Sequence, residues 1–184
     1  MNKVISLGLG TLLIFGLGGY YLIVSVQEKV LVEVLLGGKS IPVQLAIGLG
    51  YGLLTALAAT TIIRRNFFKE EKKFYHRLIS QLNLRLGSII FLSLCAGVAE
   101  ELFFRGGLQP LLGLWLTSII FVAIHGYLNP YNWRISVYGA AMVFFIAGMG
   151  YLFREVGLIS AMAAHTMLDV VLFLQLTGNV DEHT

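Results

Sequence analysis

The chain has little charge, little cysteine and little proline, and each shortage narrows the class of protein. Only 12% of its 184 residues are charged and 57% are hydrophobic, whereas soluble domains carry about a quarter charged residues. The composition therefore predicts an integral membrane protein with the lipid bilayer as its environment. One cysteine, Cys95, excludes an intrachain disulfide. Three prolines beside 21 glycines are typical of closely packed membrane helices.

The charges that are present argue for a membrane topology and against nucleic-acid binding. The net charge is only +3, and no zinc finger, nucleotide-binding loop or dinucleotide fingerprint occurs. Basic residues gather in one short segment, interpreted as a loop: Arg64, Arg65, Lys69, Lys72, Lys73 and Arg77. The positive-inside rule places this loop in the cytoplasm. Counting the spans then places both termini in the cytoplasm as well.

Apolar runs long enough to cross a bilayer divide the chain into about six segments. A span needs about 20 apolar residues, which predicts membrane helices over Val4–Val26, Ile41–Ile63, Leu86–Phe104, Leu111–His125, Ile135–Phe153 and Val156–Leu176. The first run is too long for a signal peptide and is interpreted as a retained anchor. Residues 28–39 predict a short interfacial helix. We expect an all-α polytopic bundle that forms a single transmembrane domain over residues 1–184.

The third and fourth segments are short, and breaker residues stand between them. Gly106, Gly107 and Pro110 predict a helical hairpin with its turn near Pro110. Glu100 then lies ten residues before the turn and His125 fifteen after it. At about 1.5 Å per residue, these side chains would be offset along the bundle axis by roughly 7–8 Å. Glycines such as Gly48, Gly50 and Gly52 are interpreted as sites of packing within the chain, and the sequence predicts no oligomeric state.

Three charges occur inside the apolar run of residues 88–107. Each costs at least ~2.5–3.5 kcal/mol at the centre of a membrane helix, so an ionisable residue there suggests a functional site. Glu101 and Arg105 are four residues apart and face each other as an ion pair. Glu100 is rotated about 100° from Glu101 and has no basic residue four positions away. We predict that Glu101 supports the site and that Glu100 carries the chemistry.

Two further segments bring polar groups into apolar surroundings. His165 and Asp169 have the spacing of two ligands that converge on one metal ion or one water molecule. Phe121 and His125 share a helix face, so the phenyl ring should lie beside the imidazole and exclude water. Each feature also has a purely structural interpretation, as a hydrogen bond between helices. Four uncommitted polar groups on three helices of so apolar a chain favour a buried polar site.

These residues resemble the motifs of a known family of intramembrane proteases. Residues 100–105 (EELFFR) fit EExxxR, residues 121–125 (FVAIH) fit FxxxH, and residues 165–169 (HTMLD) fit HxxxN/D. All three motifs occur in order in the CAAX-protease and bacteriocin-processing (Abi) family. The resemblance covers a motif-bearing core of about residues 86–176. It implies a multi-pass protein of the cell membrane, similar to the compact members of bacterial plasma membranes.

The resemblance also implies an activity and a role for each residue. Glutamate-activated water would hydrolyse a peptide bond of a membrane-associated peptide or protein, with Glu100 as the general base. Arg105 would anchor Glu101. Members of the family are argued to work with zinc or without metal. An ionised Asp169 would repel an oxyanion but suits a metal ion, so the sequence favours Zn²⁺, with the ligands His125, His165, Asp169 and Glu100.

Two functions of other classes fit the same residues. The first is a non-catalytic immunity or scaffold protein that binds a peptide in the same polar site without cleaving it. The second is a small proton-coupled transporter that uses the buried carboxylates and histidines as a relay. The hydropathy pattern shows no inverted halves, which argues against a transporter. Loss of function in Glu100→Gln would separate catalysis from binding alone.

Overall fold

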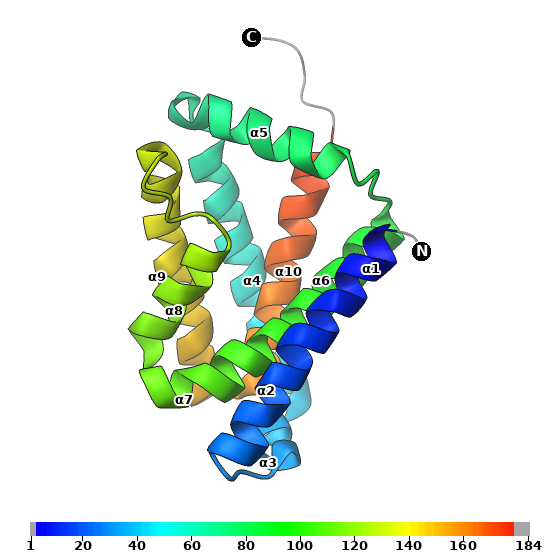
Figure 1. Ribbon diagram of the computed structural model, residues 1–184, viewed down its shortest axis with the longest axis vertical. Coiled ribbons are helices and arrows are strands. Elements are labelled where there is room, and N and C mark those ends of the chain that lie inside the picture. Colours follow the sequence, from blue (N-terminus) through cyan, green and yellow to red (C-terminus); the bar gives the residue numbers. More distant parts are fainter. Residues whose placement is uncertain (1–2, 179–184) are drawn as a thin grey trace.

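The computed structural model describes residues 3–178, and every regular element in that range is a helix (Figure 1). Five continuous helices there are long and apolar enough to span a membrane: Lys3–Val26, Ile41–Ile63 (α4), Leu86–Leu112, Trp133–Glu155 (α9) and Leu158–Thr177 (α10). A sixth apolar helix is shorter, α8 (Leu114–Ile124). The all-α bundle of about six membrane helices is therefore confirmed.

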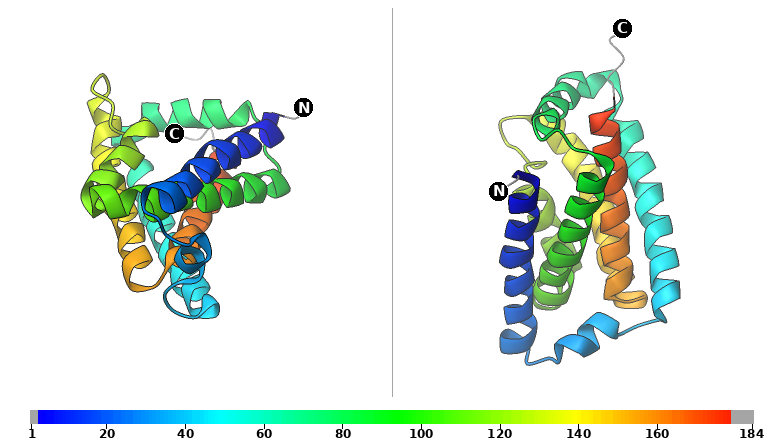
Figure 2. Two further views of the ribbon diagram at one scale, coloured as in Figure 1. Left: turned by 60° about the horizontal axis from the view of Figure 1, so that its bottom comes forward. Right: turned by 90° about the vertical axis from the view of Figure 1, so that its right-hand side faces the viewer.

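Two of the five spans contain π-helical turns. Lys3–Val26 consists of α1 (Lys3–Thr11), η1 (Leu12–Gly16), α2 (Leu17–Tyr21) and η2 (Leu22–Val26). Leu86–Leu112 consists of α6 (Leu86–Glu101), η4 (Leu102–Leu108) and α7 (Gln109–Leu112). The two helices lie side by side (Figure 2), with α1 and η1 against α6 and α2 against η4. π-Helical turns are rare and occur frequently at functional sites.

The predicted turn near Pro110 is wrong. The helix continues through Gly106 and Gly107 as η4, accommodates Pro110 in the first turn of α7, and ends at Gly113, where φ is +80°. Glycine adopts this left-handed conformation without the penalty of a side chain. The turn therefore stands 113 − 100 = 13 residues after Glu100 and 125 − 113 = 12 before His125. The axial offset falls to about 1.5 Å.

The last helix, α10, is the centre of the bundle and contacts α4, α6 and α9 (Figure 1). Glycines of α4 permit the close approach of α10. A Cβ added at Gly48 would lie 2.3 Å from the carbonyl oxygen of Ser160, and one at Gly52 would lie 2.3 Å from that of Ala164. The interpretation as packing sites within the chain is confirmed for Gly48 and Gly52 and wrong for Gly50, where an added Cβ would have no neighbour within 4 Å.

We expect Gly52→Ala to destabilise the protein by about 1–3 kcal/mol, the range for overpacking a close interface. Its Cβ meets the backbone of Ala164, which cannot move without displacing α10. Gly50→Ala is the matched control, because a Cβ there has no neighbour within 4 Å. Thermal unfolding in detergent should show a lower Tm for Gly52→Ala only; equal losses in both variants would contradict this packing.

The basic segment is a helix rather than the predicted loop. After η3 (Asn66–Phe68), α5 (Lys69–Ser80) crosses one end of the bundle (Figure 1). The start of α1 and the end of α10 lie at that same end, in agreement with an even number of crossings (Figures 1 and 2). Its cytoplasmic location stays a prediction. At the opposite end, the short helix expected within residues 28–39 is present as α3 (Leu31–Leu36), and its location at the membrane interface stays a prediction.

Candidate active site

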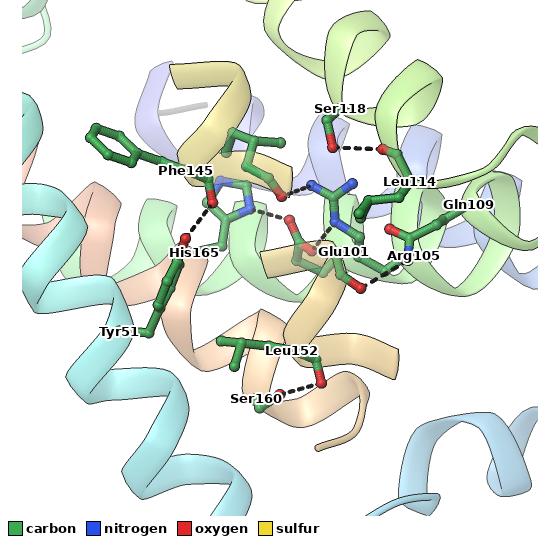
Figure 3. Close-up of polar contacts among 12 residues, drawn as sticks. Tyr51, Glu101, Arg105, Gln109, Leu114, Ser118, Phe145, Leu152, Ser160 and His165 are labelled. Atoms are coloured by element: carbon green, nitrogen blue, oxygen red, sulfur yellow. Dashed lines mark hydrogen bonds and ion pairs between the residues drawn. The ribbon is translucent and has the colours of Figure 1, made fainter. Parts of the chain in front are cut away.

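The predicted ion pair of Glu101 and Arg105 lies at the centre of a buried network (Figure 3). Arg105 donates from Nε to Oε2 of Glu101 at 2.9 Å and from Nη2 to the carbonyl oxygen of Ile146 at 3.2 Å. Both side chains of the pair are 0% exposed. A charge-assisted hydrogen bond in such surroundings is short and strong. The pair ties η4 to α9 and holds the end of α6 in place.

Glu101 has a second partner that the sequence did not predict. Its Oε1 accepts from Nδ1 of His165 at 3.0 Å, so one carboxylate joins Arg105 of η4 to His165 of α10 (Figure 3). The opposite ring nitrogen, Nε2, faces Oδ2 of Asp169 at 3.6 Å, and so the predicted pairing within α10 is present. Glu101 therefore fixes the orientation of the His165 ring, and both of its oxygens are committed.

Glu100 points to a different partner, as its rotation on the helix predicts. Its Oε2 lies 3.3 Å from Nε2 of His125, yet this oxygen is buried and makes no hydrogen bond of good geometry with any residue of the described range. Nδ1 of His125 donates to the carbonyl oxygen of Phe121 at 2.7 Å, so a neutral ring presents an unprotonated Nε2 to the carboxylate. Such a pair must share one proton or hold a water molecule that donates to both.

Phe121 joins the two histidines, and its predicted position is confirmed. Its ring stacks on His125 with centroids 4.4 Å apart and meets His165 edge-on at 5.4 Å. The guanidinium carbon of Arg105 lies 5.6 Å from its centroid on the same ring. The apolar ring of Phe121 therefore contacts His125, His165 and Arg105 at once.

The site is open on the side of His125. The side chain of His125 is 33% exposed and that of Asp169 23%, against 4% for His165.

Beyond His125, the segment that leads to α9 contacts α5 at the basic end of the bundle. Asn132 donates from Nδ2 to the buried Glu71 at 3.1 Å, and Tyr127 lies against Tyr75. Burial and the neighbouring Glu71 raise the pKa of Tyr75, which stays neutral at this contact.

Other polar contacts around the site, made by Gln109 and Tyr51, were not predicted. Gln109 donates from Nε2 to the carbonyl oxygen of Gly150 at 2.9 Å, and Tyr51 donates to that of Phe145 at 2.9 Å (Figure 3). The only sequence signal for Gln109 is a polar residue in an apolar run. Its partner lies 41 residues away, so the contact depends on the tertiary arrangement alone.

The predicted zinc ligands are together in the bundle but do not converge on one point. His125 pairs with Glu100, whereas His165 pairs with Asp169 and Glu101. Within residues 3–178 no group of three His, Cys, Asp or Glu side chains is placed to hold one metal ion. The arrangement therefore does not fit a zinc site of at least three protein ligands. Zinc stays a prediction from the sequence, and the chemistry derived below uses side chains only.

Comparison with known proteins agrees with the motifs. Residues 82–171 match the family model of type II CAAX prenyl endopeptidase Rce1-like proteins, close to the core of residues 86–176 predicted above. The chain is also 39% identical over 90 residues to the uncharacterised protein YpbD of Bacillus subtilis (strain 168). That alignment covers 48% of this chain and 45% of YpbD, so the chain matches less than half of its relative. No solved structure matches the chain at a significant level.

Proposed function

From the membership of residues 82–171 in the CAAX-protease and bacteriocin-processing family, we propose that this membrane protein is an intramembrane endopeptidase. Its substrate is a membrane-associated peptide or protein. The observation that carries the proposal is the Glu100–His125 pair. Glu101 has both oxygens engaged, whereas Oε2 of Glu100 is buried, 3.3 Å from an imidazole and without a hydrogen bond in the described residues. A carboxylate in that state is able to accept a proton from water.

The reaction follows from the two carboxylate–histidine pairs. Glu100 accepts a proton from a water molecule that His125 orients, and the water oxygen attacks the carbonyl carbon of the scissile peptide bond. Negative charge develops on the carbonyl oxygen, and a protonated imidazole is able to stabilise it. We assign that role to His165, which Glu101 and Asp169 hold from its two ring nitrogens. Glu100 then passes its proton to the leaving nitrogen as the C–N bond breaks.

Peptides released by cells that carry the wild-type protein test the proposal. Quantitative proteomics of these cells against cells with Glu100→Ala should find peptides present with the wild type and absent with the variant. The variant must reach the membrane in equal amount. A wild-type protein that releases no peptide, yet binds one with equal affinity in both forms, would instead indicate a scaffold or immunity protein.

Removal of metal tests the choice between zinc and glutamate alone. We expect purified protein to keep its cleavage activity after treatment with a strong chelator, because the described ligands form separate pairs. Elemental analysis before and after treatment measures the bound metal. Loss of activity that added Zn²⁺ restores would contradict the metal-free reaction and support zinc ligation by His125, His165 and Asp169.

A further inference from the structure

The N-terminal span reaches the candidate active site through one side chain. Gln27, which directly follows η2, donates from Nε2 to the carbonyl oxygens of Gly106 and Gly107 at 2.9 and 2.8 Å. A side-chain amide has two N–H groups, so both of its donors are used. The residues that receive them are the next two after Arg105, in the same π-helical segment η4.

Pro110 explains why η4 needs a donor from another helix. In an α-helix the carbonyl of Gly106 would accept from the amide of residue 110, and proline has no amide hydrogen. A buried carbonyl without a partner costs free energy comparable to a lost hydrogen bond. The amide of Gln27 supplies the missing donor, which allows the helix to continue through this position instead of turning there.

The neighbours of Gly106 and Gly107 also come from the N-terminal part of the chain. A Cβ at Gly106 would lie 2.9 Å from Cδ1 of Ile23, and one at Gly107 would lie 2.9 Å from Cδ1 of Leu22. One turn earlier along the first span, a Cβ at Gly19 would meet the backbone of Leu102 and Phe103 at 2.9 Å. The C-terminal part of the first span, from Gly19 to Ile23, is therefore closely fitted to η4.

We propose that Gln27 is a positioning residue for the reaction; this rests on the proposed function. It fixes the backbone of η4, which sets the place of Arg105, and Arg105 holds Glu101 against His165. The preceding residue, Glu100, is set opposite His125 by the same end of α6. The first span, which carries no motif of the family, thus controls the geometry of the motif residues.

The amide of Gln27 serves as a donor only. Its Oε1 is buried and has no hydrogen-bond partner in residues 3–178, a state that is unfavourable for an acceptor. Lysine has three N–H donors and no acceptor, whereas glutamate has the shape of glutamine and no donor at neutral pH when ionised. The position follows the last residue of the span, so the charge of a lysine there lies near the end of the membrane segment rather than at its centre. Gln27→Lys therefore keeps hydrogen-bond donors but changes the shape of the side chain, whereas Gln27→Glu keeps the shape and removes the donors.

Cleavage kinetics of three variants test the role, with a peptide found in the proteomic comparison as substrate. Gln27→Glu should lower kcat about 10- to 100-fold with little change in KM, the range for a small misplacement of catalytic groups. Gln27→Lys should recover most of kcat. Gln175→Glu, on α10, is the control, since the structure describes no side-chain hydrogen bond for Gln175. Equal kcat in Gln27→Glu and the wild type would overturn the proposal.

A second measurement is independent of any substrate. In protein with ¹⁵N-labelled histidine, Gln27→Glu should shift the imidazole signals of His125 and His165 and leave that of His76, on α5, unchanged. Unchanged site signals would also overturn the positioning role. If the wild type proves unable to cleave peptides, these shifts still decide whether Gln27 sets the site, so failure of the proposed function and failure of this inference are distinguishable.

Discussion

Glu100→Gln is expected to abolish measurable cleavage, with a fall in kcat of about 10²–10⁴-fold, the typical contribution of a general acid–base residue. Glutamine keeps the shape of the side chain but is not able to take a proton from water. The packing of Glu100, which is 7% exposed, should be kept, and so should insertion and Tm. Single-turnover cleavage of a released peptide measures the effect.

Two controls make this loss specific. Glu155→Gln also removes one negative charge, but at the exposed end of α9 and 55 residues after Glu100 in the chain. This variant should leave kcat unchanged. Peptide binding by Glu100→Gln should also stay within a few-fold of the wild type, because the carboxylate acts on water rather than on the bound chain. Cleavage by Glu100→Gln at more than a tenth of the wild-type rate would remove Glu100 as the base.

The local parts of the site were predictable because they depend on helix periodicity alone. Residues four apart share a face, which is why the Glu101–Arg105 pair and the stacking of Phe121 on His125 were both expected and are both present. The same rule separated Glu100 from Glu101. Hydropathy was similarly informative about spans: the second one, Ile41–Ile63, has the predicted bounds.

What was missed depends on contacts between distant segments. Gly106, Gly107 and Pro110 are helix-breaking residues by any local rule, yet the helix passes through them because Gln27, about 80 residues earlier in the chain, supplies a donor. The turn stands at Gly113 instead, which removes most of the predicted axial offset between Glu100 and His125. Likewise, the bond of Glu101 to His165 joins residues 64 apart, and no pattern in the sequence marks it.

The predicted zinc ligands show a different limit of prediction from sequence. The residue types His, His, Asp and Glu are those that zinc prefers, and the sequence places them on three helices. Convergence on one point is a matter of side-chain direction, which spacing does not determine. Here Nδ1 of His165 is directed at Glu101, and Nε2 of His125 faces Glu100. Two separate groups result, Glu100 with His125 and His165 with Glu101 and Asp169, in place of one ligand cluster.

Arg105→Ala should have the largest effect on stability of any single substitution in the site. Arg105 is fully buried, and its removal leaves the carboxylate of Glu101 in an apolar bundle with His165 as its remaining partner. Breaking a buried ion pair by removing one partner typically costs about 3–5 kcal/mol. Folded yield after detergent extraction, measured by size-exclusion chromatography, should fall sharply, together with Tm. Arg154→Ala, at the exposed end of α9, is the matched control.

A double variant separates the cost of leaving the carboxylate of Glu101 unpaired from the cost of losing the packing of Arg105. In Glu101→Gln/Arg105→Met no uncompensated charge remains, and the amide oxygen of Gln is still able to accept from Nδ1 of His165. The double variant should therefore be more stable than Arg105→Ala and have close to the wild-type yield, since apolar replacements of buried ion pairs are often neutral. Equal instability of both variants would show that the charge of Arg105 is not what matters. In that case η4 is held against α9 by the contact of Arg105 with the carbonyl of Ile146, and against α8 by its packing on Phe121.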